Sequence, residues 1–526
     1  MISLNRLNTQ RLLTFLHASL LSLTLVTLSF WLQGNVSRDK ADEGFLWYGT
    51  IQTASGEVPS RDFQSYDPGR YYWGAAWFKI LGDEGLLSLR ISCAMFQALG
   101  ITFALLALRR AVQSWWGLAL TGIVFVLWLP LYHRVFEYSF SMATLYFCVL
   151  LMEKPSVGRH FIGGLFVGLA AFFGRNLGLY SFVSFLLLIG FIRLRTNREQ
   201  FPKRELAWFG GILVGSSPLL LMLVLVPGFA ESLIGSIADL VTRRSTNLPL
   251  PIPWPWLQSR YSFSTSVLFL IFPLFVFGTL TYLLLVDGRA LKGKELLTAS
   301  AFVSLPFMHY AFSRADLEHL SGCIPPLLIG LMSLPQLFPF QCRKLLTLVW
   351  LPVISIASSW GAAKHSPYYI VRAAGPMYVQ KSIDQHVFWV RQDIARSIDA
   401  VTYISNNFVA PNEGILFAPY GTFYYGIVKR KSPLRDVYFL WNQTEARQQE
   451  MLSDLRKKNV NWIVLGDNDP SMALDGKEEL RFKTTHPLLW KHIMEEFDIV
   501  EFNGGLSHDE KLMHRKPVRS EYEAAP

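Results

Sequence analysis

Long apolar stretches recur along this chain, and they constrain its fold more than any other feature. A helix that crosses the hydrocarbon core of a bilayer needs about 20 predominantly apolar residues. Eleven stretches approach or reach this length: residues 12–32, 86–108, 117–132, 138–152, 161–173, 179–192, 207–226, 265–286, 297–312, 320–338 and 345–361. The sequence therefore predicts a polytopic α-helical membrane protein with about eleven transmembrane helices.

The composition agrees with a membrane protein and excludes two other classes. Of the 526 residues, 51% are hydrophobic and 17% are charged, whereas a typical soluble domain has about 25% charged residues. A row of soluble domains is therefore excluded, and so is a disordered chain, because disorder requires low hydrophobicity. The stretch at 12–32 is long for a signal peptide and lacks a cleavage site of small residues. We expect it to be retained as the first span.

Positive charges are distributed unevenly between the two sides of the expected membrane. With a cytoplasmic N-terminus, the cytoplasmic segments carry 16 Lys and Arg residues, and the short outer loops carry three, Arg134, Arg175 and Arg314. Because Lys and Arg accumulate in cytoplasmic loops, this orientation is favoured. The net charge of +10 then reflects topology, and we expect no nucleic-acid partner. After an odd number of spans the C-terminal part lies outside, in the periplasm, a lumen or the extracellular space. We expect a bacterial inner-membrane protein with a periplasmic or extracellular C-terminal domain.

Residues 380–526 have the pattern of a small extracytoplasmic α/β domain, separate from a transmembrane domain at residues 1–361. The expected elements follow in order: a helix around 394–408, a strand at 415–418, a helix at 445–458, a strand at 460–465, a helix at 487–497 and a strand at 498–502. Alternation of short apolar strands with amphipathic helices is typical of an α/β fold. Residues after about 507 are polar, and we expect them to be frayed.

Two long loops are expected on the outer side, at residues 33–85 and 227–264. The first holds eight acidic and five basic residues, and the carboxylates of Asp42 and Glu43 are adjacent in it. A carboxylate at the membrane surface can act as a general base toward a hydroxyl, and clustered carboxylates can hold a divalent metal. The alternative is a solvated acidic loop whose aromatic residues anchor it at the interface. Residue types alone favour that alternative.

The order of motifs in residues 41–90 favours a functional first outer loop over a merely solvated one. The Asp42-Glu43 pair is followed by Gly-Glu-Val-Pro-Ser-Arg-Asp-Phe at 56–63 and by Asp-Pro-Gly-Arg-Tyr-Tyr-Trp at 67–73. Phe-Lys-Ile-Leu-Gly at 78–82 and Leu-Leu-Ser-Leu-Arg at 86–90 then lead into the second span. This arrangement resembles the GT-C superfamily of membrane glycosyltransferases. The relevant relatives are the protein mannosyltransferases that use dolichyl-phosphate mannose, the lipid A aminoarabinose transferase and the bacterial lipopolysaccharide sugar transferases.

The resemblance implies a glycosyltransferase whose sugar donor is carried on a polyprenyl phosphate at the outer face of the membrane. The carboxylate that matches Asp42 would be the general base for the acceptor hydroxyl, and Glu43 would orient the acceptor or the base. Attack at the anomeric carbon would invert its configuration and expel the lipid phosphate. The acceptor would be a glycan, a lipid or a protein, and membrane lipids would be further partners.

A phosphate leaving group requires a cation opposite it. Arg314 with His319, between the ninth and tenth spans, is the preferred phosphate-binding pair, and Arg175 and Arg70 are further candidates. The alternative is that Arg314 lies among lipid headgroups with Asp316 as its partner. The first loop also offers candidate substrate-binding residues, Asp62, Asp67, Tyr71 and Tyr72. A divalent metal cation is a further expectation, with its ligands undetermined.

Two other functions compete with the enzyme. One is a transporter or flippase for a lipid-linked sugar, and the other is a non-catalytic membrane protein whose C-terminal domain binds a partner. Transporters usually place polar residues in broken helices near the middle of the membrane. In this chain the spans are apolar and the acidic residues lie in outer loops, which favours the glycosyltransferase.

Overall fold

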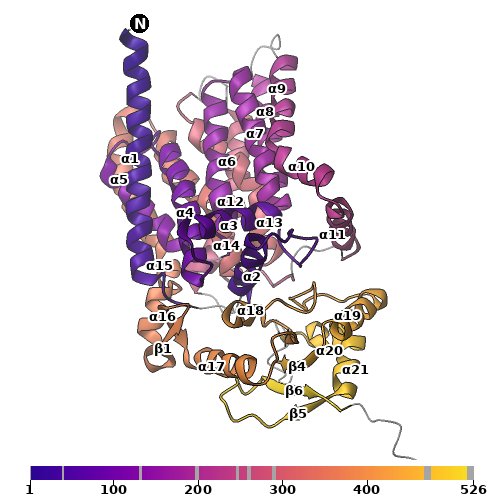
Figure 1. Cartoon of the computed structure of the whole chain (residues 1–526). Coiled ribbons are helices and arrows are strands. Elements are labelled where there is room, and N and C mark those ends of the chain that lie inside the picture. Colours follow the sequence, from indigo (N-terminus) through magenta and orange to yellow (C-terminus); the bar gives the residue numbers. More distant parts are fainter. Residues whose placement is uncertain are drawn as a thin grey trace, which may run out of the picture. The chain divides into compact units, whose positions relative to one another are not determined.

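The structure is a computed structural model that describes residues 2–37, 41–129, 133–195, 201–243, 248–257, 262–286, 292–466 and 476–517 (Figure 1). It divides into two compact units. The first unit comprises residues 1–34, 67–70 and 90–373, and the second comprises residues 35–66, 71–89 and 374–526. The second unit thus combines most of the first outer loop with the C-terminal part, whereas the sequence-based boundary assigned that loop to the membrane domain.

The first unit is a bundle of α-helices. Its helices are α1 (Ile2–Gln33), α4 (Leu86–Leu108), α5 (Trp115–Trp128), α6 (Val135–Glu153), α7 (Val157–Phe173), α8 (Arg175–Arg195), α9 (Phe201–Gly215), α10 (Ser217–Leu225), α11 (Phe229–Arg243), α12 (Phe263–Leu285), α13 (Glu295–Ser313), α14 (Leu317–Ser333), η3 (Leu334–Leu337), α15 (Phe340–Lys364) and α16 (Pro367–Ala374). Leu86–Leu89 of α4 and the last residue of α16 fall in the second unit, so the division runs through both helices.

Each of the eleven predicted stretches corresponds to a helix or to a bent pair of helices. Among the described residues, eight helices are long and apolar enough to cross a membrane, and the pair α9–α10, bent by 50°, raises this number to nine if it is one span. The other two, α5 and α7, have 14 and 17 residues. At a rise of about 1.5 Å per residue they fall short of a hydrocarbon core of about 30 Å. The chain is therefore an integral membrane protein, and in the described residues eight or nine of the eleven expected spans have the length and composition of a full crossing.

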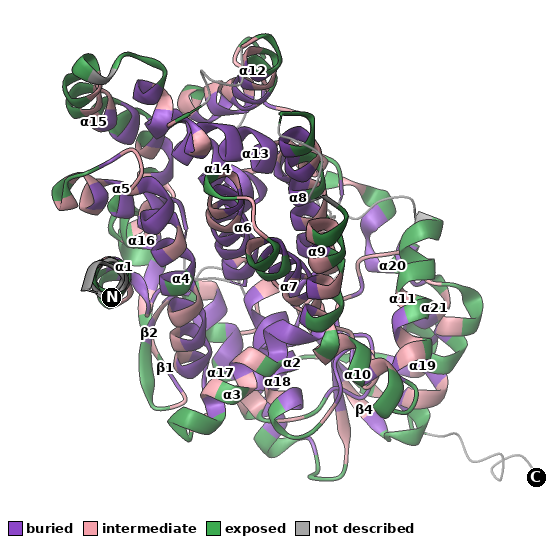
Figure 2. Cartoon of the chain, turned by 90° about the horizontal axis from the view of Figure 1, so that it is seen from above, coloured by how far each residue is buried: buried purple, intermediate pink, exposed green. Residues whose placement is uncertain are grey.

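The helices at the centre of the bundle are buried, and those around them present apolar faces outward. Figure 2 shows α6, α13 and α14 largely in the colour of buried residues. By contrast, α15 exposes a row of apolar side chains, Leu345, Leu348, Val349, Val353 and Ile356. Lipid tails do not penalise exposed Leu or Ile, so such faces are expected on lipid-facing helices. Helix α7 meets α9 through Gly164 and Gly168, where a Cβ would come within 1.9 Å and 2.3 Å of backbone oxygens of α9.

The second unit contains the predicted α/β domain. Its elements are α2 (Asp42–Ala54), most of α3 (Pro68–Leu81), β1 (Tyr378–Ile383), β2 (His386–Arg391), α17 (Gln392–Asn407), β3 (Gly414–Ala418), α18 (Thr422–Val428), α19 (Glu445–Lys457), β4 (Val460–Leu465), η7 (Glu478–Leu480), α20 (Phe482–Thr485), α21 (Pro487–Glu496), β5 (Phe497–Val500) and β6 (Lys511–Arg515). Strands β1 and β2 form an antiparallel hairpin. The main sheet has the order β3-β4-β6-β5, in which β3 and β4 are parallel and the other neighbours antiparallel.

One expectation about this unit was wrong. Residues after 507 were expected to be frayed, yet β6 lies inside the sheet between β4 and β5. Only Leu512 and Met513 of β6 are buried, so its apolar run is too short to signal a strand. The first outer loop contains α2 and α3. Helix α2 packs on α18 so closely that a Cβ on Gly44 would lie 2.5 Å from the backbone nitrogen of Phe423.

His486 makes the stability of this domain dependent on pH. Its ring is buried beside Phe439 and Phe482, and burial lowers the pKa of His486 from 6.5 to about 4. Below pH 6.5 the unfolded chain binds a proton that the folded chain does not, so stability falls as the pH drops toward 4. Between pH 7 and pH 5 we expect His486 to lower the free energy of unfolding of the domain by about 2 kcal/mol. Hydrogen exchange of the peptide covering α20 and α21 at pH 7 and pH 5 measures it. A His486→Asn variant that lost as much protection as the wild type would contradict the assignment.

Candidate active site

Polar side chains gather at one end of the first unit, where α5 connects to α6, α7 to α8 and α13 to α14. We call this region the polar end. Arg134 precedes α6, Arg175 begins α8, and Arg314 follows α13. Residues 67–70 belong to the same unit and contact it through Asp67 and Arg70. The three outer arginines of the sequence are therefore brought to one region of the bundle.

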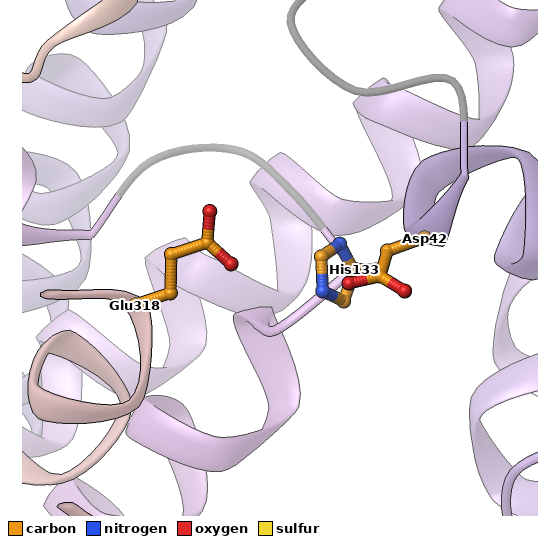
Figure 3. A group of neighbouring side chains, drawn as sticks. All are labelled: Asp42, His133 and Glu318. Atoms are coloured by element: carbon orange, nitrogen blue, oxygen red, sulfur yellow. The ribbon is translucent and has the colours of Figure 1, made fainter. Parts of the chain in front are cut away.

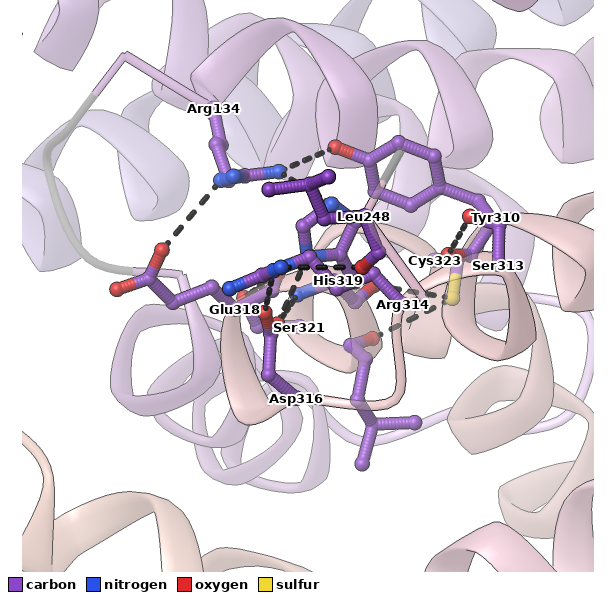
Figure 4. A network of polar contacts seen from close by, with 11 residues as sticks. Arg134, Leu248, Tyr310, Ser313, Arg314, Asp316, Glu318, His319, Ser321 and Cys323 are labelled. Carbon is purple, nitrogen blue, oxygen red and sulfur yellow. Dashed lines mark hydrogen bonds and ion pairs between the residues drawn. The ribbon is translucent and has the colours of Figure 1, made fainter. Parts of the chain in front are cut away.

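A chain of hydrogen bonds joins Arg134, His319 and Asp316 at the polar end (Figure 4). Nη1 of Arg134 lies 3.1 Å from Nε2 of His319, and Nδ1 of His319 lies 2.7 Å from Oδ1 of Asp316. A guanidinium has no acceptor atom, so Nε2 must accept and Nδ1–H must donate to Asp316. His319 is therefore a neutral imidazole held in one tautomer.

Asp316 organises the start of α14. Its Oδ1 also accepts the backbone N–H of His319 at 2.7 Å, which makes it the N-cap of that helix. Its Oδ2 accepts Nε–H of Arg314 at 2.8 Å. Burial alone would raise the pKa of Asp316, but its interactions with His319 outweigh burial and lower the pKa to about 2. Asp316 is thus an ionised anchor, and Arg314 is its partner.

Arg134 has different neighbours from the other cations. Its Nη1 donates to the hydroxyl of Tyr310 at 2.7 Å and to the imidazole of His319. Its Nε lies 3.6 Å from the carboxylate of Glu318, whose side chain is 59% exposed. Two neutral side chains therefore hold the guanidinium of Arg134, and one of its carboxylate neighbours, Glu318, is exposed.

The other three candidate arginines each hold a carboxylate at 2.8 Å. Arg314 pairs with Asp316 and also donates to the carbonyl of Leu248 at 3.0 Å. Arg175 pairs with Asp67, whose other oxygen accepts the backbone N–H of Arg175, and Nη1 of Arg175 donates to Ser236 of α11. The carboxylate partners compensate much of the positive charge of Arg314 and Arg175. Both arginines are therefore well suited to fix loops and helix ends.

Arg70 forms the most buried ion pair of the polar end. Its Nη1 lies 2.8 Å from Oε1 of Glu137, and the two side chains are 4% and 8% exposed. Its Nε donates to the carbonyl of Phe173 at 2.8 Å, and its guanidinium lies over the ring of Phe136. Arg70 thereby ties the start of α3 to α6 and α7.

Asp42 and Glu43 lie in the second unit, in the first turn of α2. The N-terminus of a helix favours negative charge, and the capping residue Ala41 offers no side-chain acceptor there. Asp42 is partly exposed and accepts a hydrogen bond from the hydroxyl of Tyr438 at 3.3 Å, whereas Glu43 is buried. Of the two carboxylates, Asp42 is therefore the one that a substrate can reach.

The proposed substrate-binding residues have diverse surroundings. Asp62 accepts the backbone N–H of Val58 and two N–H groups of Arg61, and the bond from Arg61 is the main cause that lowers the pKa of Asp62. Tyr71 is fully buried, and its hydroxyl accepts the backbone N–H of Tyr66. Tyr72 is 38% exposed. Their roles toward a substrate stay predictions.

Metal ligands are offered by His133 and Glu318 of the first unit. A ring nitrogen of His133 and a carboxylate oxygen of Glu318 lie within 4.8 Å of each other. Figure 3 draws both side chains together with Asp42, which belongs to the second unit. An imidazole and a carboxylate suit a divalent transition metal, but two ligands are fewer than the usual set. Metal dependence therefore stays a prediction.

Sequence reasoning did not single out Tyr310 or Tyr438, and it named Arg134 only as one of three outer arginines. The signal for Arg134 was its place among three outer arginines, but its sequence neighbours resemble an ordinary helix end. Its partner His319 lies 185 residues away, and Tyr438 lies 396 residues from Asp42. Such pairings depend on tertiary packing, so residue types and spacing do not reveal them.

Comparisons with known proteins return matches only among solved structures. No protein-family model matches the chain, and neither does any curated protein. The chain is similar to ArnT from Cupriavidus metallidurans bound to undecaprenyl phosphate, at 12% identity and a TM-score of 0.49, over 96% of this chain and 98% of that one. It is also similar to the apo oligosaccharyltransferase of Archaeoglobus fulgidus, at 13% identity and a TM-score of 0.45, over 95% of this chain and 75% of that one.

Proposed function

We propose that the chain is an inverting glycosyltransferase that uses a sugar on a polyprenyl phosphate as donor, at the outer face of a bacterial inner membrane. The observation that carries this proposal is the chain Asp316–His319–Arg134, which holds a guanidinium rigidly at the polar end. Charge-assisted hydrogen bonds from such a group suit a phosphate. The N-terminus is then cytoplasmic, and the C-terminal domain lies outside.

In the proposed reaction, the carboxylate of Asp42 takes the proton of an acceptor hydroxyl. The acceptor oxygen forms a bond to the anomeric carbon while the bond from that carbon to the phosphate oxygen breaks. The electron pair leaves with the polyprenyl phosphate, and Arg134 with His319 stabilises the charge that develops there. Glu43, buried one residue further on, orients the base. The acceptor is a hydroxyl of a glycan, a lipid or a protein.

The geometry supports a division of labour among the candidate cations. Arg134 is the phosphate ligand, because the hydroxyl of Tyr310 and the imidazole of His319 hold its guanidinium in place, and the carboxylate of Glu318 at 3.6 Å is exposed. The other cations, Arg314, Arg175 and Arg70, bind carboxylates at 2.8 Å and position the elements around it. This ranks Arg134 with His319 above the pair Arg314 with His319 that the sequence favoured.

Undecaprenyl phosphate binding to the purified full chain tests this assignment. We expect Arg134→Gln to weaken binding by about 10- to 100-fold, since hydrogen bonds to charged groups are worth about 1.5–3 kcal/mol. Native mass spectrometry in detergent at constant ionic strength gives the dissociation constants. Arg193→Gln is the matched control, because Arg193 is an exposed helix-end arginine paired with Glu205. Equal affinity of Arg134→Gln and the wild type would remove Arg134 from the site.

A further inference from the structure

The segment that connects α18 to α19 lies along the first outer loop inside the second unit. We call residues 432–440 the connecting strap; they contain no helix or strand. The backbone N–H of Ser432 donates to the hydroxyl of Tyr48 at 3.2 Å. Further along, Arg435 donates to the carbonyls of Ser60 and Arg61. The strap is thus attached to the loop at several points along its length.

Gln64 attaches the part of the strap that carries Tyr438. Its Oε1 accepts the backbone N–H groups of Val437 and Tyr438 at 3.0 Å and 2.9 Å. Its own backbone N–H donates to the carbonyl of Arg435 at 2.8 Å. The ring of Tyr438 packs against Phe45 and Tyr420, with centroids 5.8 Å and 5.0 Å away. Both the backbone and the ring of Tyr438 are therefore fixed.

The strap is also anchored on the side of the C-terminal domain. Asp436, whose side chain is buried, binds Nε of Arg447 in α19 at 3.0 Å and Nη1 of Arg435 at 3.3 Å. The same backbone segment therefore contacts α19 through Asp436 and the first outer loop through Gln64. This places the hydroxyl of Tyr438 against Oδ1 of Asp42 by two independent sets of contacts.

We propose that Tyr438 is a positioning residue for Asp42, through which the C-terminal domain contributes to the transfer reaction. This inference rests on the proposed role of Asp42 as general base. The phenol donates its proton to Oδ1 of Asp42 and thereby fixes the orientation of the carboxylate that accepts the proton of the acceptor hydroxyl. The C-terminal domain then takes part in the reaction, because it holds the base in the orientation that accepts a proton.

The distance sets the size of the effect. A typical O–H···O hydrogen bond is about 2.7–2.8 Å long, and the Tyr438–Asp42 contact is 3.3 Å. Catalytic hydrogen bonds are often long before the substrate binds. A donor to an ionised carboxylate stabilises its charged form, so removing the phenol is expected to make Asp42 easier to protonate.

Carbodiimide labelling of the full chain in proteoliposomes tests this without an activity assay. A water-soluble carbodiimide with glycinamide modifies protonated carboxyl groups, and mass spectrometry reports the labelled fraction of Asp42 at each pH. We expect Tyr438→Phe to move the midpoint of Asp42 labelling upward by about 0.5–1 pH unit. Tyr424→Phe is the matched control, because its hydroxyl donates to Glu510 at 2.8 Å in the same unit. That variant should move the midpoint of Glu510 and leave that of Asp42 in place.

Release of undecaprenyl phosphate from undecaprenyl-phosphate sugars separates the inference from the proposed function. If both are correct, Asp42→Asn is inactive, and Tyr438→Phe lowers turnover with an acid limb displaced to higher pH. If the wild type releases no undecaprenyl phosphate while the labelling midpoint still moves, the proposed function fails and the contact stands. If Asp42→Asn stays active, transfer stands and the role of Asp42 as the base fails. An unmoved Asp42 midpoint in Tyr438→Phe, together with a moved Glu510 midpoint in the control, overturns the inference.

Discussion

Replacing Asp42 by Asn is expected to lower sugar transfer by about 10²- to 10⁴-fold, the range that a positioned general base contributes. The amide keeps the size of the side chain and its acceptor oxygen, so the hydrogen bond from Tyr438 can persist. It cannot take up the proton of the acceptor hydroxyl at neutral pH. Undecaprenyl-phosphate sugars, tested one at a time with the chain in proteoliposomes, give the readout as released undecaprenyl phosphate.

Two further variants make this result specific. Asp42→Glu restores a base on a longer side chain, and we expect it to recover part of the lost turnover. Asp399→Asn removes an exposed carboxylate of α17 that pairs with Lys381, so it controls for loss of negative charge in the same unit. Transfer by Asp42→Asn at the rate of Asp399→Asn would remove Asp42 as the base. A wild-type chain that transfers no sugar would leave the transporter and the non-catalytic binding protein as the remaining functions.

Hydropathy predicted the membrane part of the fold because lipid imposes one rule on every span. Each apolar stretch became a helix, including the bent pair α9–α10. Hydropathy did not predict the helices of the first outer loop, α2 and α3, because they are not spans. In α2, nearly every residue from Glu43 to Thr53 is buried, although Glu43, Thr50 and Gln52 are polar, so no simple apolar stripe marks the helix. Its burial depends on α18, which lies almost 400 positions further along the chain.

The site was predictable in its residue types and less so in its pairings. The sequence gathered Arg314, His319, Arg175 and Arg70 as candidates, and the structure brings all four into one unit. Which arginine is compensated by a carboxylate depends on contacts such as Arg70 with Glu137 and Arg175 with Asp67. A charge in the sequence does not reveal its partner, so the ranking of the cations had to come from tertiary structure.

The pair Arg70–Glu137 carries the largest expected effect on stability. Both side chains are buried, and removing one partner of a buried ion pair leaves a charge without compensation, at a cost of about 3–5 kcal/mol. We expect Glu137→Gln to lower the thermal unfolding temperature of the chain in detergent by several degrees or more. Glu153→Gln is the control, because its pair with Arg110 lies at a more exposed helix end.

A double variant, Arg70→Met with Glu137→Leu, separates burial of charge from loss of a contact. Apolar residues of similar volume often replace a buried pair without loss of stability, so we expect the unfolding temperature to return toward that of the wild type. A Glu137→Gln chain that unfolds at the wild-type temperature would contradict the assignment. In the double variant, the affinity for undecaprenyl phosphate then decides whether Arg70 also serves the donor: a lost affinity in a stable chain means that it binds the phosphate, and a retained affinity assigns it to the framework that positions Arg134.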